Sequence, residues 1–213
     1  MRLFLALWAV LLLTGCQNDP LSGKNDPKLR WWALGFFGPT FMNGWVDDSF
    51  VEDINGKLIW FGTNGFIGYD NPNYSAQGWA NIGQSPRGVV GADLPKRIYV
   101  RWQSIVEQKT YEGWVEIPEE ARQIMRTSTN RRCAKTPEHT ALPWGVVQLG
   151  LAPGGVMQVW VVDSCLNYVK VARAQAEIEP LGPHLGKSGG KYYPQTENSK
   201  RYIEQYGIPY GSW

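Results

Sequence analysis

Apolar and polar residues alternate over 96–107, KRIYVRWQSIVE, and this pattern constrains the fold more than any other part of the sequence. The apolar face of the segment consists of Ile98, Val100, Trp102 and Val106. The opposite face consists of Tyr99, Arg101, Gln103 and Glu107. Alternation with a period of two is typical of a β-strand that buries one face. We therefore expect a strand here, paired with a second strand over 111–117.

Turn signals between other apolar runs predict further strand pairs. Asn55-Gly56 separates the runs 46–53 and 57–62. Asn-Gly between two alternating runs is the strongest short signal for a β-hairpin. Residues 152–155, Ala-Pro-Gly-Gly, should form the turn between two strands over 146–162, because proline and glycine suit successive turn positions.

Two short helices are expected beside these strands. The first should span 118–130, where Pro118 suits the first helical turn. The second should span 198–207, with Asn198 as its cap and Gly207 at its end. Runs rich in glycine, asparagine and proline predict loops over 182–190 and over 63–97, the latter with one short strand.

The chain of 213 residues is long enough to bury a core as a single domain. Its remaining strands are expected at 30–37 and at 168–179, where the run VARAQAEIE also suits a helix. We therefore predict one mainly β (α+β) domain over 30–213. It should be an antiparallel, sandwich-like domain with two short helices.

The first fifteen residues have the pattern of a bacterial export signal. Arg2 gives the positive start, and residues 3–13 are uncharged but shorter than the ~20 apolar residues that span a bilayer. The segment ends Leu-Thr-Gly-Cys16, which resembles the lipobox of bacterial lipoproteins. A buried N-terminal helix with an incidental cysteine is the alternative. The resemblance implies cleavage before Cys16, a diacylglyceryl group on its thiol and acylation of the new amine.

Residues 16–29 follow the signal as the lipidated cysteine and a polar tether that contains Pro20 and Pro27. Acyl chains on Cys16 would make the lipid bilayer a partner of the protein. In the lipoproteins that the signal resembles, aspartate at the next position tends to retain the protein in the inner membrane, and this chain has Gln17. We therefore expect an anchor in the outer membrane that faces the periplasm.

Cys133 and Cys165 remain once Cys16 is lipidated. An even pair of cysteines in an oxidising compartment predicts a disulfide bond between them. Spacings that hold zinc, such as C-x₂-C or H-x₃-H, do not occur in the sequence. The sequence therefore predicts neither a metal site nor a cofactor.

Neither charge nor motifs indicate a nucleic-acid-binding protein or an enzyme. Loss of Arg2 with the signal leaves 20 basic residues against 19 acidic ones, a balance that gives no reason to expect nucleic acid. Hydrolytic catalysis needs a base beside its nucleophile, and His139, which we expect in a surface loop, and His184 are the two histidines. Asp47-Asp48 and Glu52-Asp53 could serve as paired carboxylates, but such residues more often form the solvated side of a hairpin. We predict no catalytic residue.

Two segments resemble a family of bacterial lipoproteins described only as a domain of unknown function. Within 94–120, the pattern W-x-S-x-x-E-x-x-x-Y is matched by Trp102, Ser104, Glu107 and Tyr111. Within 146–161, G-L-A-P-G-G at 150–155 is followed by Trp160. Some members of the family resemble immunity lipoproteins that are encoded beside type VI secretion lipase effectors. This resemblance implies a periplasmic protein that binds a toxic phospholipase and blocks it.

Three classes of function compete for this chain. An inhibitor of a secreted antibacterial effector needs a stable scaffold and an exposed face, often rich in aromatic residues. An envelope scaffold or a glycan-binding lipoprotein would use the same aromatic residues, whereas an enzyme would need a base. We rank the three in this order. Aromatic residues in predicted loops are the candidates for partner binding: Tyr69, Tyr74, Trp79, Tyr192, Tyr193, Tyr210 and Trp213.

Substitution Cys16→Ser tests the anchor. Without the thiol, the diacylglyceryl group has no attachment point, so uncleaved precursor should accumulate and labelling with a radioactive fatty acid should disappear. Cys133→Ser is the matched control and should leave the labelling intact. Normal labelling of the Cys16→Ser protein would refute the lipoprotein interpretation.

Overall fold

The computed structural model describes residues 32–83, 86–127, 132–133, 136–140, 145–163 and 165–213. The predicted signal and the predicted tether, with Cys16, lie outside the described residues. Within the described ranges, no helix has both the length and the apolar character that a membrane span requires.

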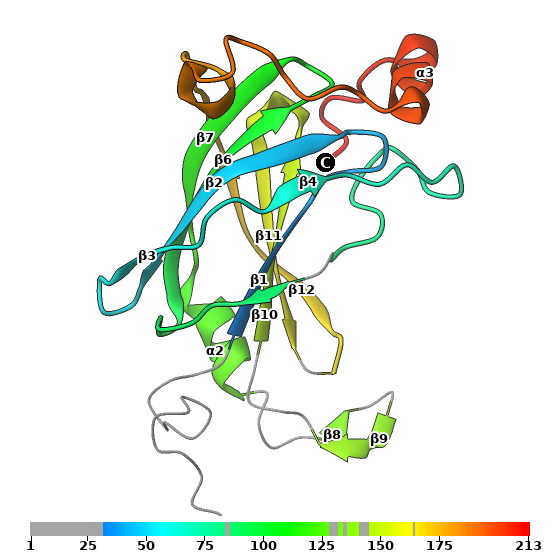
Figure 1. Ribbon diagram of the computed structural model, residues 1–213. Helices are drawn as coiled ribbons and strands as arrows, with labels where there is room; N and C mark the ends of the chain where they lie inside the picture. Colours follow the sequence, from blue (N-terminus) through cyan, green and yellow to red (C-terminus); the bar gives the residue numbers. More distant parts are fainter. Residues whose placement is uncertain (1–31, 84–85, 128–131, 134–135, 141–144, 164) are drawn as a thin grey trace, which may run out of the picture.

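One sheet has five strands in the order β12-β11-β10-β1-β5 (Figure 1). Their bounds are β1 Trp32–Phe37, β5 Arg87–Gly88, β10 Gly145–Ala152, β11 Val156–Asp163 and β12 Tyr168–Gln175. Neighbouring strands are antiparallel except for β1 and β10, which are parallel. A parallel pair needs a long connection, and here the connection contains every strand of the second sheet except β13.

The second sheet has six strands in the order β13-β7-β6-β2-β3, with β4 paired to β2. Their bounds are β2 Gly44–Asp53, β3 Leu58–Trp60, β4 Gly65–Ile67, β6 Pro95–Ser104, β7 Lys109–Glu116 and β13 Glu177–Ile178. All of its pairs are antiparallel. The predicted hairpin at Asn55-Gly56 is confirmed as the β2–β3 connection, and β6 pairs with β7 as predicted.

The apolar faces of the two sheets enclose the main core. Ile98, Val100 and Trp102 of β6 are at most 1% exposed and share this core with Leu34 of β1 and Leu149 of β10. The alternation therefore reflects a strand with one buried face, as predicted for 98–102. The strand ends at Ser104, so Val106 and Glu107 lie in the turn that follows, and Gln103 of the predicted outer face is buried. The single, mainly β, sandwich-like domain is confirmed, with the parallel β1–β10 pair as a departure from a wholly antiparallel arrangement.

Two α-helices, α2 (Glu119–Thr127) and α3 (Glu197–Tyr206), occur among the described residues, close to their predicted positions. The cap of α3 is Thr196 and not Asn198, because the Thr196 hydroxyl accepts a hydrogen bond from the Ser199 backbone N–H at 3.2 Å. The same hydroxyl lies 2.9 Å from Asn43 Oδ1. This tertiary contact fixes the start of the helix two residues before the predicted cap.

Three other parts of the chain refine the sequence predictions. Residues 168–179 form β12 and β13, so the strand interpretation is confirmed and the helix is excluded. Two short strands, β4 and β5, interrupt residues 63–97, where one was expected. The predicted loop over 182–190 contains one short 3₁₀ segment, η3 (Pro183–Gly186).

Cys133 and Cys165 form a disulfide bond, as predicted. Their Cα atoms are 5.2 Å apart. Cys133 ends β8 (Arg132–Cys133), which pairs with β9 (Thr136–Thr140), and Cys165 follows β11. The bond therefore ties the small β8–β9 hairpin to the end of the five-stranded sheet.

The turn between β10 and β11, η2 (Pro153–Gly155), allows a stability test. Gly155 has a positive φ of 78°, and a Cβ there would lie 2.8 Å from the Ala176 backbone oxygen. Gly189 also has a positive φ, 62°, but has nothing within 4 Å of a built Cβ. Gly189→Ala should therefore lose about 1 kcal/mol of unfolding free energy through backbone strain, and Gly155→Ala roughly 1–3 kcal/mol more through overpacking. Urea unfolding measures both, and equal losses would contradict this account of the turn.

Candidate functional site

A β-bulge in β2 brings two carboxylates to the outer face of the six-stranded sheet. The register between β2 and β6 shifts between Val46 and Asp48, which leaves Asp47 as the extra residue. A bulge of this kind turns a side chain away from its regular direction. The Asp47 side chain is 1% exposed, and it accepts hydrogen bonds from Gln103 Nε2 at 2.8 Å and from the His184 backbone N–H at 2.9 Å.

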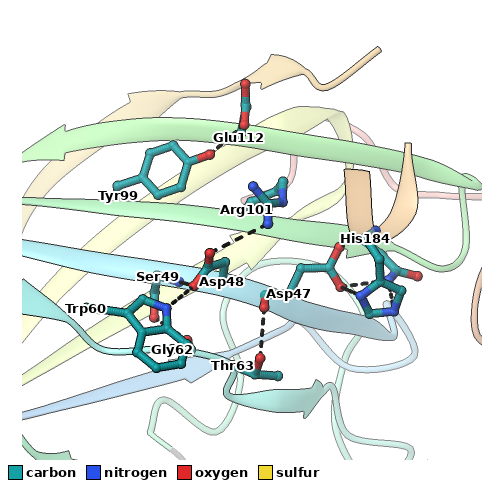
Figure 2. A network of polar contacts seen from close by, with 11 residues as sticks. Asp47, Asp48, Ser49, Trp60, Gly62, Thr63, Tyr99, Arg101, Glu112 and His184 are labelled. Carbon is teal, nitrogen blue, oxygen red and sulfur yellow. Dashed lines mark hydrogen bonds and ion pairs between the residues drawn. The ribbon is translucent and has the colours of Figure 1, made fainter. Parts of the chain in front are cut away.

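The His184 ring completes this buried contact (Figure 2). Its Nδ1 lies 3.2 Å from Asp47 Oδ1, and its Nε2 lies 3.3 Å from Gln103 Nε2. Because an amide nitrogen only donates, the tautomer that satisfies both contacts accepts at Nε2 and donates from Nδ1 to Asp47. Each ring nitrogen thus lies within hydrogen-bond distance of a side chain of the sheet. The arrangement fastens η3 to the sheet.

Asp48 holds the most exposed tryptophan of this face. Its Oδ1 accepts a hydrogen bond from Trp60 Nε1 at 2.6 Å, and its Oδ2 lies 3.6 Å from Arg101 Nη2. Trp60 is nevertheless 69% exposed. The indole is therefore fixed at one edge while most of the ring remains accessible.

Four aromatic side chains lie in register across β3, β2, β6 and β7. Trp60 is opposite Phe50, Phe50 is opposite Tyr99, and Tyr99 is opposite Trp114. The ring centroids of Phe50 and Tyr99 are 5.8 Å apart, and those of Tyr99 and Trp114 are 5.4 Å apart. We call Trp60, Phe50, Tyr99 and Trp114 the aromatic row. It crosses the outer face of the sheet, opposite the core.

Polar contacts also hold Tyr99 and Trp114 of the aromatic row. Tyr99 Oη donates a hydrogen bond to Glu112 at 2.5 Å (Figure 2). Burial, followed by this contact with Glu112, raises the pKa of the Tyr99 phenol. The Arg97 guanidinium lies 4.3 Å from the centroid of the Trp114 ring and also pairs with Glu52 at 2.6 Å. These side chains are ordered by their own contacts.

The residue at the centre of the W-x-S-x-x-E-x-x-x-Y pattern joins three separate segments. Glu107 accepts hydrogen bonds from Tyr111 Oη at 3.0 Å, from Tyr210 Oη at 2.9 Å and from the Gly154 backbone N–H at 3.0 Å. Its side chain is 2% exposed. Glu107 therefore connects the β6–β7 turn to the β10–β11 turn and to the C-terminal segment.

A family model described as "Protein of unknown function (DUF2931)" matches residues 18–211. The chain belongs to the DUF2931 family. The match confirms the resemblance to a family of unknown function, and the family description assigns no activity. No curated protein and no solved structure matches the chain.

The loop aromatics predicted as a partner-binding set do not form one surface in this DUF2931 chain. Tyr69 and Tyr74 pack edge to face at 5.6 Å, away from the aromatic row in the strands. Trp79 is half-buried against Trp160 and Phe37. Tyr192 and Tyr193 reach the end of the six-stranded sheet, where Tyr193 stacks on Trp45 at 4.1 Å and Tyr192 Oη lies 3.4 Å from Thr110 Oγ1.

The last two members of the predicted set lie at the C-terminus. Tyr210 is 58% exposed, although its hydroxyl is bound to Glu107. Trp213 is 7% exposed, which corrects the prediction of a surface position. Its Nε1 donates to the Pro153 carbonyl at 3.2 Å, and its backbone oxygen accepts from Arg173 at 2.9 Å. Trp213 therefore packs as a core residue of the chain end.

The other residues that the sequence offered for catalysis or metal binding include Asp53 and His139. Asp53 is 2% exposed and accepts hydrogen bonds from the backbone N–H groups of Asn55 and Lys57, both at 2.9 Å, so it shapes the hairpin turn and is not solvated. His139 falls in β9, and its side chain lies outside the described residues. Across the described part of the chain, no group of three or more His, Cys, Asp or Glu residues could hold a metal ion.

Sequence reasoning missed the aromatic row. The available signal was the second face of 96–107, where Tyr99 lies between Arg97 and Arg101. A single strand cannot reveal which residues of other strands will be its neighbours. The row is visible only when the registers of four strands are known.

The Tyr210–Glu107 contact predicts how stability changes at high pH. Burial, and then the hydrogen bond to Glu107, raise the pKa of Tyr210 from 10.0 to about 12. A folded-state pKa above the unfolded value gives stability that is fully present below about pH 10 and is lost as pH rises to about 12. The unfolding free energy of the Tyr210→Phe protein should fall less steeply over this range than that of the wild type. Tyr206→Phe on α3 is the control, and an identical slope for Tyr210→Phe and wild type would contradict the assignment.

Proposed function

We propose that the mature protein is a non-catalytic lipoprotein, anchored in the outer membrane and facing the periplasm, that binds a secreted antibacterial effector such as a lipase and neutralises it. The observation that carries this proposal is the aromatic row, an exposed face ordered without a partner. The lipobox at Cys16 supports the anchor, and the Cys133–Cys165 disulfide suits an oxidising compartment.

Rigid aromatic side chains favour tight binding to a protein. Tryptophan, tyrosine and arginine are the residues that most often dominate protein–protein interfaces. Side chains already held in place lose little conformational entropy when a partner binds. Trp60, fixed by Asp48, and Trp114, covered by Arg97, meet this condition.

An envelope scaffold or glycan-binding lipoprotein is the second candidate, because exposed aromatic rings also bind sugars. The rings of this face have no common plane: Phe50 and Tyr99 are inclined at 59°, and Tyr99 and Trp114 at 54°. The Arg97 guanidinium already occupies one face of Trp114. These features suit an irregular protein surface better than a flat sugar chain, so we rank effector binding first.

Deletion of the gene tests the proposal. Deleted cells should survive poorly beside sibling cells that deliver the effector, and the wild-type gene supplied in trans should restore survival. The purified protein should bind the purified effector that the sibling cells deliver, measured by calorimetry. Survival equal to the parent's, together with no effector binding, would refute the proposal. Binding to purified cell-wall glycan without effector binding would favour the second candidate.

A further inference from the structure

The charged side chains around the aromatic row have an excess of acid. The carboxylates of this outer face are Asp48, Glu52, Glu112, Glu116 and Glu177. The cations beside them are Lys96, Arg97 and Arg101. The whole chain, in contrast, has a formal net charge of +2. Negative charge is therefore concentrated on the face that also exposes the aromatic row.

Two of these carboxylates directly oppose each other. Glu177 of β13 is the register partner of Glu112 of β7. Like charges at directly opposed strand positions destabilise a sheet. Tyr99 donates a hydrogen bond to Glu112, while neither Glu177 nor Glu116, both exposed, makes an ion pair within the described part of the chain. On β6, Arg101 is the register partner of Glu112 and Arg97 is that of Glu116. Glu177 faces only Glu112, so the excess of acid beside Tyr99 and Trp114 lies at Glu177.

We propose that the aromatic row and its acidic rim dock a basic protein surface, with an arginine or lysine of the partner placed between Glu112 and Glu177. This inference rests on the proposed function and adds the binding surface and the chemistry of the partner. A cation there would relieve the Glu112–Glu177 repulsion and could also lie against the rings of Tyr99 or Trp114. Complementary charge of this kind speeds association and selects the partner.

Charge complementarity separates this occupant from the others. An isologous contact between two copies at this face would place acid against acid. Nucleic acid and anionic lipid would be repelled for the same reason. A neutral glycan would leave the Glu112–Glu177 repulsion in place.

The test uses the gene-deleted strain, supplied in trans with wild-type or variant genes and mixed with effector-delivering sibling cells. Glu177→Gln, Glu116→Lys with Glu177→Lys, and Trp60→Ala change the proposed surface. Glu204→Lys and Tyr206→Ala, both at exposed positions on α3, are the matched controls. We expect the surface variants to weaken effector binding roughly tenfold or more and to lower survival toward that of the deleted strain. The controls should protect like the wild type.

Thermal unfolding of the purified variants separates a binding role from a structural one. Glu177→Gln removes the repulsion with Glu112, so it should leave the Tm unchanged or raise it while it weakens protection. A lower Tm with an equal loss of protection would assign Glu177 a structural role and overturn the inference. Surface variants that protect like the wild type, or controls that lose protection equally, would also overturn it. Failure of the wild-type gene itself to protect would instead refute the proposed function.

Discussion

Burial of one face of β6 is the constraint on which the rest of the structure depends. Ile98, Val100 and Trp102 point into the core, so the residues between them must point outward, whatever their chemical character. Tyr99 and Arg101 are fixed on the outer face in this way. Antiparallel pairing transmits the same division to β2 and β7, which places Phe50 and Trp114 beside Tyr99. The core therefore determines the geometry of the face that we propose for binding.

The residues that carry the family resemblance have a structural role, because they hold the domain together. Glu107 is nearly buried and has partners on three segments that are distant in the sequence. A carboxylate removed from water is stable only when its oxygens accept hydrogen bonds, so Glu107, Tyr111 and Gly154 depend on one another. Such a motif is compatible with many outer surfaces. In this chain the motif residues thus hold the scaffold together, and the surface that we propose for binding is built from other residues.

The sequence predicted local structure well where the signal was local. The Asn55-Gly56 hairpin, the strand over 96–107 and the helices near 118–130 and 198–207 follow from period and turn chemistry. The sequence did not predict features that depend on contacts between distant residues. Thr196 caps α3 because Asn43 contacts it. Trp213 is buried because Pro153 and Arg173 bind it. The aromatic row was missed for the same reason, since register between strands is a tertiary property.

The parallel pairing of β1 with β10 has a consequence for how the chain reaches its folded state. Trp32 of β1 pairs with Gly145 of β10, which lies more than a hundred residues later in the chain. This pair can therefore form only after β10 has been synthesised. Contacts between residues far apart in the sequence slow folding, because a large loop must close before they form. Five strands of the six-stranded sheet, β2, β3, β4, β6 and β7, precede β10 in the chain and can pair earlier. During this interval β1 can pair with β5 along only part of one edge, and its other edge is left open, a feature of the kind that chaperones shield.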